Sequence, residues 1–521
     1  MPELDSGPWL FEDWLGRQDA LTTYFRPKSV DELVAFLGSF PVSKLRVRGI
    51  GAGHSTSNVA RPFRLGDDKK RAGIVVRADA MPLAFPDAAK AWWKPGVAAS
   101  EKLVRVEAGA SIAALNRRFF DQGLAFPNLG SYDQQQIAGA IATGTHGTGL
   151  KTGPLCDMVA SIELVTFLKT SSGQPKLTHV RVEPADGPTD KAAFDAAKSM
   201  HGMELIREDD AFYSCVVGLG FFGIVTAITL RLRAPFWLQE KVAVKRWPEV
   251  AATLPAAADQ KDYWYDFLLS TRTTPNGIGS GTADYKCLVT ERVECPGSGW
   301  GEPRKDERRA RLEKMHKGDP HGRTKELATL ASAHPRIAND CAVETFVQEA
   351  AQPDKSASHH IFRVSIGDLV FASSSEVSIP LDQVKVAVDA IIKNNEALDA
   401  LGLHHTSPFG VRFSQGSKHY LSMAYGRETC TIEAPMLLYS KARGGPLGDR
   451  PSDDVISEVL KSFVAAMRAA VPSARFHHGQ RNWNTRADLE AYPKFKEWKA
   501  EYDRFNAFGV FSNEASEAWG L

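Results

Sequence analysis

The sequence predicts an α+β fold with two domains, and three observations lead to this prediction. A chain of 521 residues is too long for one ordinary hydrophobic core. Strand-like runs at residues 73–77 and 103–107 are followed by a helical stretch after Ser111, a rhythm that suits an α+β nucleotide-binding domain. From about residue 238 onward the glycine density drops and strands mix with helices, which indicates a second domain.

Local signals place further elements along the chain. Ser29 is a candidate N-cap for a helix whose first turn carries acidic residues. The run 155–168 is typical of a strand, and residues 375–400 are typical of a strand followed by an amphipathic helix. The expected apolar face of that helix consists of Val386, Val388, Ile391 and Ile392.

The first glycine-rich segment, residues 48–55, reads Arg-Gly-Ile-Gly-Ala-Gly-His-Ser and follows a short strand-like run. Its glycines allow backbone N–H groups to curl around a phosphate, because no Cβ blocks close approach or positive φ. This segment alone leaves two interpretations open. It is either a loop that binds a pyrophosphate or a glycine turn that carries a surface histidine.

The second glycine-rich segment, residues 126–149, has glycines at 139, 144, 147 and 149 with interleaved Thr and Ala. Little side-chain bulk remains there, so a planar ligand and its diphosphate can lie against the backbone. The same ligand therefore accounts for both segments.

Together the two segments resemble the FAD-binding loops of the vanillyl-alcohol oxidase superfamily, the PCMH-type FAD-binding proteins. Within it they are most similar to the aldonolactone and alditol oxidase branch. The resemblance rests on Gly-x-Gly-His-Ser at 51–55, Asn-x-Gly-Ser at 128–131, Gln-x-x-Gly at 136–139 and Thr-His-Gly-Thr-Gly at 145–149. It implies a PCMH-type FAD-binding domain beside an α/β substrate-binding cap domain with an antiparallel sheet.

The resemblance also implies that FAD is joined covalently to His54 through the 8α-methyl carbon of the flavin. Because no cysteine occurs at 133–137, a single covalent link is expected. The cofactor-binding residues implied by the resemblance are Arg48, Gly49, Gly51, Ala52, Gly53, His54, Ser55, Gly130, Ser131, Gln135, Gly139, Thr143, Gly144, Thr145, His146, Gly147, Gly223 and Ile224.

A third segment, Gly218 to Gly223, fits the dinucleotide pattern G-x-G-x-x-G, which requires a strand before it and a helix after it. A preceding strand is plausible. The residues after Gly223 alternate in the manner of a strand, so the nicotinamide interpretation fails. In the resembling family the backbone near Ile224 touches the cofactor instead.

The resembling family binds its substrate with a Glu-x-Arg strand and a later histidine motif that ends in lysine. In this sequence Arg412 stands where the family has its arginine. Gly410 stands where the family has its glutamate, and Gln480 stands where it has its lysine. Both departures make a sugar substrate less certain. Glu433, 21 residues after Arg412 and expected on the next strand, is predicted to orient the substrate hydroxyl or accept its proton. A surface or structural ion pair is the alternative for Glu433.

Two residues beside the expected flavin complete the candidate site. Ser131 lies at the flavin edge by resemblance and is a candidate catalytic residue, with a structural role in its loop as the alternative. Gly130 takes the place at which alanine hinders dioxygen in the resembling family, so we expect an oxidase that forms hydrogen peroxide.

The predicted function is therefore a covalent-FAD oxidase that transfers a hydride from a sugar-like or other small alcohol or lactone to flavin N5. Two alternatives remain open. One is a natural-product tailoring flavoenzyme of the same fold. The other is an FAD-binding dehydrogenase or electron-transfer protein that does not use dioxygen.

Composition excludes several other classes of function. Lys and Arg number 63 against 62 Asp and Glu, so no overall charge attracts nucleic acid or an anionic membrane. The six cysteines lack C-x-x-C spacing, and adjacent His404 and His405 would face opposite sides of a strand, so no metal site is expected. With neither a signal peptide nor a membrane span in sight, a cytoplasmic location is expected.

The expected domain division follows from these assignments. The FAD-binding domain covers residues 1–238, the substrate-binding cap covers 239–469, and a C-terminal segment, 470–521, returns to the FAD domain. Between 302 and 317 the chain is rich in charged residues, which is typical of a solvated helix rather than a nucleic-acid contact.

Overall fold

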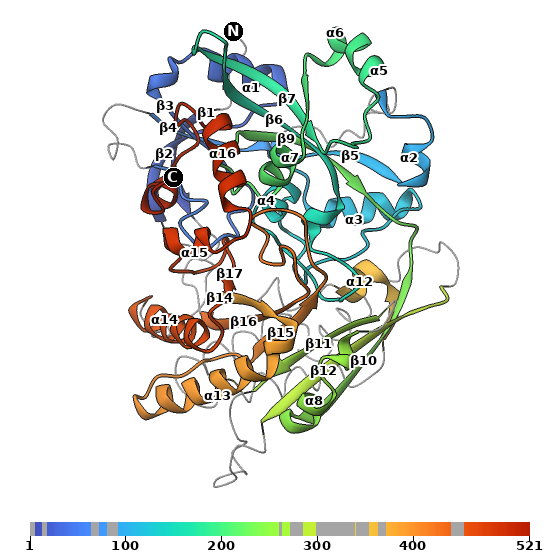
Figure 1. Ribbon diagram of the computed structural model, residues 1–521, viewed down its shortest axis with the longest axis vertical. Helices are drawn as coiled ribbons and strands as arrows, with labels where there is room; N and C mark the ends of the chain where they lie inside the picture. The colour runs from blue at the N-terminus through green and yellow to red at the C-terminus, as the bar shows by residue number, and fades with distance from the viewer. Residues whose placement is uncertain are drawn as a thin grey trace.

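The structure is a computed structural model with helices and strands arranged around three sheets (Figure 1). This mixed content confirms the predicted α+β class. Two sheets and the C-terminal helices form the upper part of the view in Figure 1, and the third sheet forms the lower part. The charged stretch 302–317 lies outside the described residues. The structure describes residues 6–12, 18–63, 72–80, 92–259, 263–270, 285–297, 339, 354–362, 371–438 and 453–521.

The first sheet has the strand order β1-β2-β4-β3, and β4 runs parallel to both of its neighbours. Helix α1 (Val30–Gly38) packs beside it and begins at Ser29, whose hydroxyl accepts a hydrogen bond from the Glu32 N–H at 3.1 Å. The predicted N-cap is therefore confirmed. The strands are β1 (Ser6–Glu12), β2 (Gln18–Phe25), β3 (Leu45–Gly49) and β4 (Ala72–Val76).

The second sheet has the order β5-β9-β6-β7-β8, and helices α3 (Ile112–Asp121) and α7 (Asp209–Val216) belong to the same core. The prediction of a strand before Gly218 is wrong, because helix α7 precedes this glycine. The strand expected after Gly223 is confirmed as β9. The strands are β5 (Leu103–Glu107), β6 (Val159–Lys169), β7 (Pro175–Glu183), β8 (Glu204–Arg207) and β9 (Ile224–Arg231).

The third sheet, called the cap sheet here, has eight strands in the order β13-β10-β12-β11-β15-β16-β14-β17, and all its pairs are antiparallel. Its strands are β10 (Trp237–Arg246), β11 (Tyr263–Leu269), β12 (Lys286–Cys295), β13 (Asp354–Ala357), β14 (Phe371–Pro380), β15 (Phe409–Ser414), β16 (Thr429–Leu438) and β17 (Arg475–Phe476).

Helices α13 (Val384–Ala400) and α14 (Asp453–Ala470) pack on the cap sheet through one shared apolar core. Val388, Ile391 and Ile392 are buried in that core as expected. Val386 is 46% exposed, so its assignment to the buried face is wrong. Residue 386 precedes the buried Ala387 and Val388, and the helical period of 3.6 residues turns its side chain outward.

The C-terminal helices return to the first two sheets. Trp498 and Phe505 of α16 pack against Phe222, and the Val47 N–H of β3 donates to the Val510 carbonyl at 2.7 Å. Strand β17 pairs with β14 in the cap sheet, so the segment 470–521 contributes to both parts of the molecule. The tail helices are α15 (Arg486–Glu490), α16 (Phe495–Phe505) and α17 (Glu514–Ala518).

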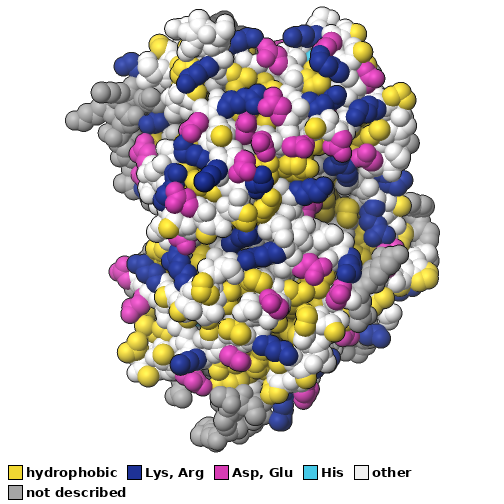
Figure 2. Space-filling model, viewed as in Figure 1, with side chains coloured by type: hydrophobic (Ala, Val, Ile, Leu, Met, Phe, Trp, Pro, Cys, Tyr) yellow, Lys and Arg dark blue, Asp and Glu magenta, His cyan; other side chains and the backbone are white. Residues whose placement is uncertain are grey.

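Short helices connect these elements, and among the described helices none is long and apolar enough to cross a membrane. On the face drawn in Figure 2, basic and acidic side chains are interspersed rather than gathered by sign, in keeping with the balanced composition. The short helices are α2 (Val97–Ser100), α4 (Ile137–Ala142), α5 (Lys191–Ala196), α6 (Lys198–His201), α8 (Trp247–Thr253) and α12 (Ser358–Phe362).

Candidate functional site

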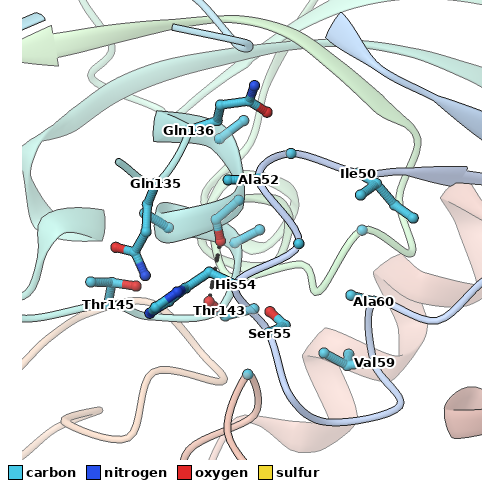
Figure 3. Close-up of a pocket in the computed structure, with 18 of the residues that line it drawn as sticks. Ile50, Ala52, His54, Ser55, Val59, Ala60, Gln135, Gln136, Thr143 and Thr145 are labelled. Atoms are coloured by element: carbon cyan, nitrogen blue, oxygen red, sulfur yellow. Dashed lines mark hydrogen bonds between the residues drawn. The ribbon is translucent and has the colours of Figure 1, made fainter. Parts of the chain in front are cut away.

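A cavity of about 350 Å³ lies where the first two sheets meet the cap sheet. One part of its wall is the loop after β3, and another is the segment that contains α4 (Figure 3). Strands β14, β15 and β16 and the loop after β17 complete it. The cavity therefore joins the two glycine-rich segments to the strands expected to bind substrate.

Small residues form much of the wall near the glycine-rich loops, and the backbone lies close behind them. A Cβ at Gly51 would lie 2.6 Å from the Gln136 side-chain oxygen, and one at Gly223 would lie 2.7 Å from the Val165 carbonyl oxygen. Of the described residues that line the cavity, only Arg48 and Arg412 are Arg or Lys. A diphosphate there would therefore be held mainly by backbone N–H groups, as the glycine pattern predicts.

Arg48 lines the cavity, but its guanidinium contacts protein. It donates to the carbonyl oxygens of Val59, Leu219, Gly220 and Phe511 at 2.5 to 3.1 Å. Burial lowers the pKa of Arg48 to about 10, so the group is charged at neutral pH. The side chain therefore ties the loop after β3 to the chain before β9 and to the C-terminal tail, rather than reaching out to a phosphate.

His54 is the histidine of the first glycine-rich loop. Its ring stacks on Tyr132 with centroids 4.6 Å apart and planes 12° from parallel. Figure 3 shows the ring directed toward Gln135 and Thr145 of the second segment. Burial, and then the nearby His477, lower the pKa of His54 to about 4. The imidazole is therefore neutral at physiological pH and keeps a lone pair for bonding.

Nearly all the residues predicted from the sequence line this one cavity. They are Arg48, Gly49, Gly51, Ala52, Gly53, His54, Ser55, Gly130, Ser131, Gln135, Gly139, Thr143, Thr145, His146, Gly223, Ile224, Arg412, Glu433 and Gln480.

Gly144 and Gly147 were also predicted to bind the cofactor, but neither lines the cavity. Gly144 has φ +77° just after α4, where a left-handed residue ends the helix. A Cβ at Gly147 would lie 2.2 Å from the Leu129 carbonyl oxygen. In this structure the two glycines meet local backbone requirements of the second segment, and their role in cofactor binding stays a prediction.

Arg412 on β15 and Glu433 on β16 meet at the cap end of the cavity. The predicted neighbouring strand is confirmed, and Arg412 Nη1 donates to Glu433 Oε2 at 2.9 Å. Gln480 adds its amide, with Nε2 at 3.3 Å from Glu433 Oε1. Burial opposes the charge on Arg412, but Glu433 and Glu376 outweigh it and raise its pKa. A charged guanidinium is therefore fixed beside a carboxylate.

Sequence reasoning missed Glu376 of β14, which is the most buried acid of this cluster. Its carboxylate lies 3.1 Å from His146 Nε2 and accepts a hydrogen bond from Gln480 at 3.4 Å. Burial disfavours its charge, yet His146, His477 and Arg412 together lower the pKa of Glu376 to about 2. The available signal was the alternation of Ala372, Ser374 and Glu376, which places all three side chains on one face of the strand.

His146 and His477 are the other histidines in the wall. The Nδ1–H of His146 donates to the Gly147 carbonyl at 2.9 Å, which directs Nε2 toward Glu376. Burial lowers the pKa of His146, but the pairing with Glu376 outweighs this and raises it. His477 Nδ1 accepts from the Gly479 N–H at 3.0 Å, and burial lowers its pKa.

Outside the cavity, Cys156, Asp157 and His419 place ligand-type atoms within 4.8 Å of one another. The Ser417 hydroxyl donates to Asp157 at 2.7 Å, so the group joins the chain before β6 to the turn after β15. Burial raises the pKa of Asp157 to about 6.

His404 and His405 lie in a loop, not on the expected strand, and His404 pairs with Asp399 at 2.6 Å.

A cavity lined by two glycine-rich segments, with a histidine in its wall and an Arg–Glu pair at the cap end, has the features expected of a flavin-binding oxidoreductase. Comparison with known proteins identifies which kind of flavoprotein the chain resembles. Residues 22–168 match the family described as FAD binding domain, and residues 320–518 match D-arabinono-1,4-lactone oxidase.

Some known proteins are similar in sequence to most of this chain, and others to part of it. L-gulono-1,4-lactone dehydrogenase from Mycobacterium tuberculosis is 23% identical over 517 residues, which cover 97% of each chain. Alditol oxidase from a Streptomyces species is 32% identical over 185 residues, 36% of this chain and 33% of that protein. The crystal structure of cholesterol oxidase from B. sterolicum superposes with a TM-score of 0.66 at 13% identity, over 99% of this chain and 97% of that one. This last likeness shows the fold.

These matches confirm the predicted resemblance to the FAD-binding proteins of the vanillyl-alcohol oxidase superfamily, in the aldonolactone and alditol oxidase branch. It is an FAD-dependent oxidoreductase that acts on a CH–OH group.

Proposed function

We propose that this protein is a covalent-FAD oxidase that oxidises a hydroxyl group of a small sugar-like alcohol or lactone and passes the electrons to dioxygen, which forms hydrogen peroxide. The observation that carries the proposal is that one cavity has His54 in one part of its wall and the Arg412–Glu433 pair in another. FAD supplies the hydride acceptor when bound, and the protein supplies the remaining groups.

His54 is proposed as the attachment point for the flavin. Its imidazole is buried in the cavity wall and held against Tyr132, and its pKa of about 4 keeps the ring neutral. A neutral nitrogen has the lone pair that a bond to the 8α-methyl carbon requires. The small residues of both glycine-rich segments leave room for the isoalloxazine and the diphosphate.

Arg412 and Glu433 are proposed to act on the substrate hydroxyl. The guanidinium stabilises negative charge that develops on the oxygen as its proton leaves. Glu433 orients that hydroxyl or accepts its proton, and its side chain is 22% exposed, so it is accessible from the cavity. Gln480 holds the carboxylate, and Ser131, which lines the cavity, is proposed to contact the flavin edge.

Sugar-like substrates are proposed because relatives along the chain are named for lactones and an alditol. The natural-product tailoring flavoenzyme stays open, because Gly410 and Gln480 depart from the family's pattern of charged groups. A panel of aldonolactones, alditols and hydrophobic alcohols, tested for bleaching of the flavin without air, separates these substrate classes.

A dehydrogenase is the second candidate, since a relative that covers 97% of this chain carries that name. Anaerobic reduction by the substrate, followed by stopped-flow mixing with air, distinguishes the two. Rapid reoxidation with stoichiometric peroxide supports the oxidase, and slow reoxidation supports the dehydrogenase.

Covalent attachment has its own test. Acid-precipitated wild-type protein should keep its yellow colour, and His54→Ala should release all its flavin into the supernatant. A colourless wild-type pellet would contradict the tether without touching the proposed reaction.

A further inference from the structure

We propose that Glu376 is a positioning residue for the oxidation of the substrate alcohol, and that it stands in from β14 for the acidic side chain missing at Gly410 on β15. The inference rests on the proposed function, because it concerns the placement of Arg412 and Gln480. It assigns a role to a carboxylate that sequence reasoning did not find.

The first argument is the register of the cap sheet. Gly410 lies opposite Glu433, and Glu433 lies opposite Glu376 on its other side. Directly opposed residues of antiparallel strands share one face, with Cβ atoms about 5 Å apart. The three positions therefore form one row across β15, β16 and β14. The acids at the second and third positions therefore lie in the same row as Gly410, where the resemblance implies an acid.

The second argument is the space above Gly410. A Cβ there would lie 3.4 Å from Arg412 Nη2 and 3.5 Å from Nη1. The guanidinium therefore lies over the glycine, where a longer side chain would stand. From this position it reaches Glu433 at 2.9 Å and Glu376 at 3.7 Å.

The third argument is how completely Glu376 is held. Its side chain is only 4% exposed, and it contacts His146, Gln480 and Arg412. His146 belongs to the second glycine-rich segment, so this contact ties the cap sheet to the proposed flavin wall. The Gln480 amide lies 3.4 Å from Glu376 and 3.3 Å from Glu433, and so bridges the two carboxylates.

A positioning role follows from these contacts. Without the charge of Glu376, Arg412 loses its second carboxylate and one of the two acceptors of the Gln480 amide is no longer charged. Both groups then face the substrate in more than one arrangement. Misplacement of such groups by about 1 Å reduces rates by about 10²-fold.

The test compares Glu376→Gln with a matched control, Glu240→Gln. Glu240 is also a buried acid of the cap sheet, paired with Arg292 at 2.8 Å, but it does not line the cavity. In anaerobic stopped-flow, Glu376→Gln should lower the limiting rate of flavin reduction about 10²-fold. Its substrate Kd should change less than about threefold, and Glu240→Gln should keep the wild-type rate within about threefold.

A further variant keeps the inference falsifiable. Glu376→Asp retains the charge and should retain a larger part of the rate than Glu376→Gln. Equal losses in Glu376→Gln and Glu240→Gln would overturn the positioning role, because they would indicate a structural effect only.

A second readout needs no substrate. The charge on His146 is set by the groups that face it, Glu376, His477 and Arg412, and it should appear as an inflection when the flavin absorption spectrum is titrated with pH. Glu376→Gln removes the partner that raises the pKa of His146, so the inflection should move to lower pH. An unmoved inflection with a wild-type reduction rate would refute the inference. If no alcohol reduces the wild-type flavin, the proposed function fails, and this titration still shows whether Glu376 holds the charge on His146.

Discussion

One cluster of Arg and Glu in the second sheet and another at the cavity differ in what lies beside them. In the second sheet, Glu163 of β6 accepts hydrogen bonds from Arg105 and Arg181 at 2.6 to 3.1 Å. Glu183 and Arg207 extend this sheet cluster. In the site cluster, Glu376, Glu433 and Arg412 meet with the help of Gln480.

Access to the cavity separates the two clusters. Glu163 and Arg181 have side-chain exposures of 1% and 0%, and none of the sheet-cluster residues line the described cavity. Arg412 and Glu433 are 24% and 22% exposed and do line it. Nearly the same residue types therefore stabilise the fold in one place and remain available to a substrate in the other. Only the tertiary position distinguishes them.

The largest effect is expected from a substitution that removes the central acid of the sheet cluster. Glu163→Ala leaves Arg105 and Arg181 charged and buried without their main acceptor, which costs about 3–5 kcal/mol in the free energy of unfolding. Chemical denaturation measures this loss. The flavin content of the folded fraction should stay at the wild-type level, because the cluster does not touch the cavity. Loss of flavin without loss of stability would contradict the assignment.

Arg412→Ala tests the site cluster, where we expect a large effect on activity and a smaller effect on stability. Removing a preorganised positive group should lower the rate of flavin reduction by about 10²–10³-fold, while the free energy of unfolding changes by less than in Glu163→Ala. Arg412→Lys keeps the charge but loses the planar fork and should be intermediate. Anaerobic reduction kinetics and denaturation on the same samples provide both values. A variant that is destabilised but reduces its flavin at the wild-type rate would place Arg412 with the structural arginines.

The pH dependence of stability sharpens the comparison. Burial opposes the charge of Glu163, but Arg105 and Arg181 outweigh it and lower its pKa to about 2. A lowered carboxyl pKa adds stability that is fully present above the unfolded-state value and is lost as the pH falls toward 2. From the ordinary value of 4.5 the contribution is about 3 kcal/mol.

Denaturation of the wild type between pH 6 and pH 3 should therefore show a falling free energy of unfolding, and Glu163→Gln should show a shallower slope. The other acids titrate in both proteins, so the difference between the two curves is the quantity to compare. Parallel curves would show that Glu163 does not contribute to acid sensitivity.

The sequence was sufficient for features that depend on local backbone chemistry. The glycine-rich loops, the Ser29 cap and the strand after Gly223 depend on neighbouring residues, and the structure confirms the cap and the strand. The contact between Arg412 and Glu433 was also predictable, because it follows from strand periodicity over a short separation.

Features set by distant parts of the chain were not predictable. Glu376 reaches the site only through the pairing of β14 with β16, and its histidine partner is 230 residues away along the chain, between positions 146 and 376. Glu163 stands in an apolar run, and nothing in that run indicates which residues cover it. Gly144 and Gly147 were predicted to bind the cofactor but do not line the cavity, because a glycine pattern does not show which side of a segment faces a cavity.

The smallest effect is expected from a substitution of Gly130, which leaves both clusters intact. Gly130 lines the cavity, and a Cβ there would meet only the His146 carbonyl oxygen at 3.4 Å and Thr145 Cγ2 at 3.5 Å, so alanine fits without a large shift. If dioxygen approaches the flavin past this residue, Gly130→Ala should slow reoxidation by about tenfold, a change of about 1.4 kcal/mol in the barrier. Flavin reduction and the free energy of unfolding should both stay near wild-type values, since neither Arg412 nor Glu163 is touched. Mixing the reduced variant with air in a stopped-flow instrument measures the effect, and unchanged reoxidation would show that dioxygen arrives by another route.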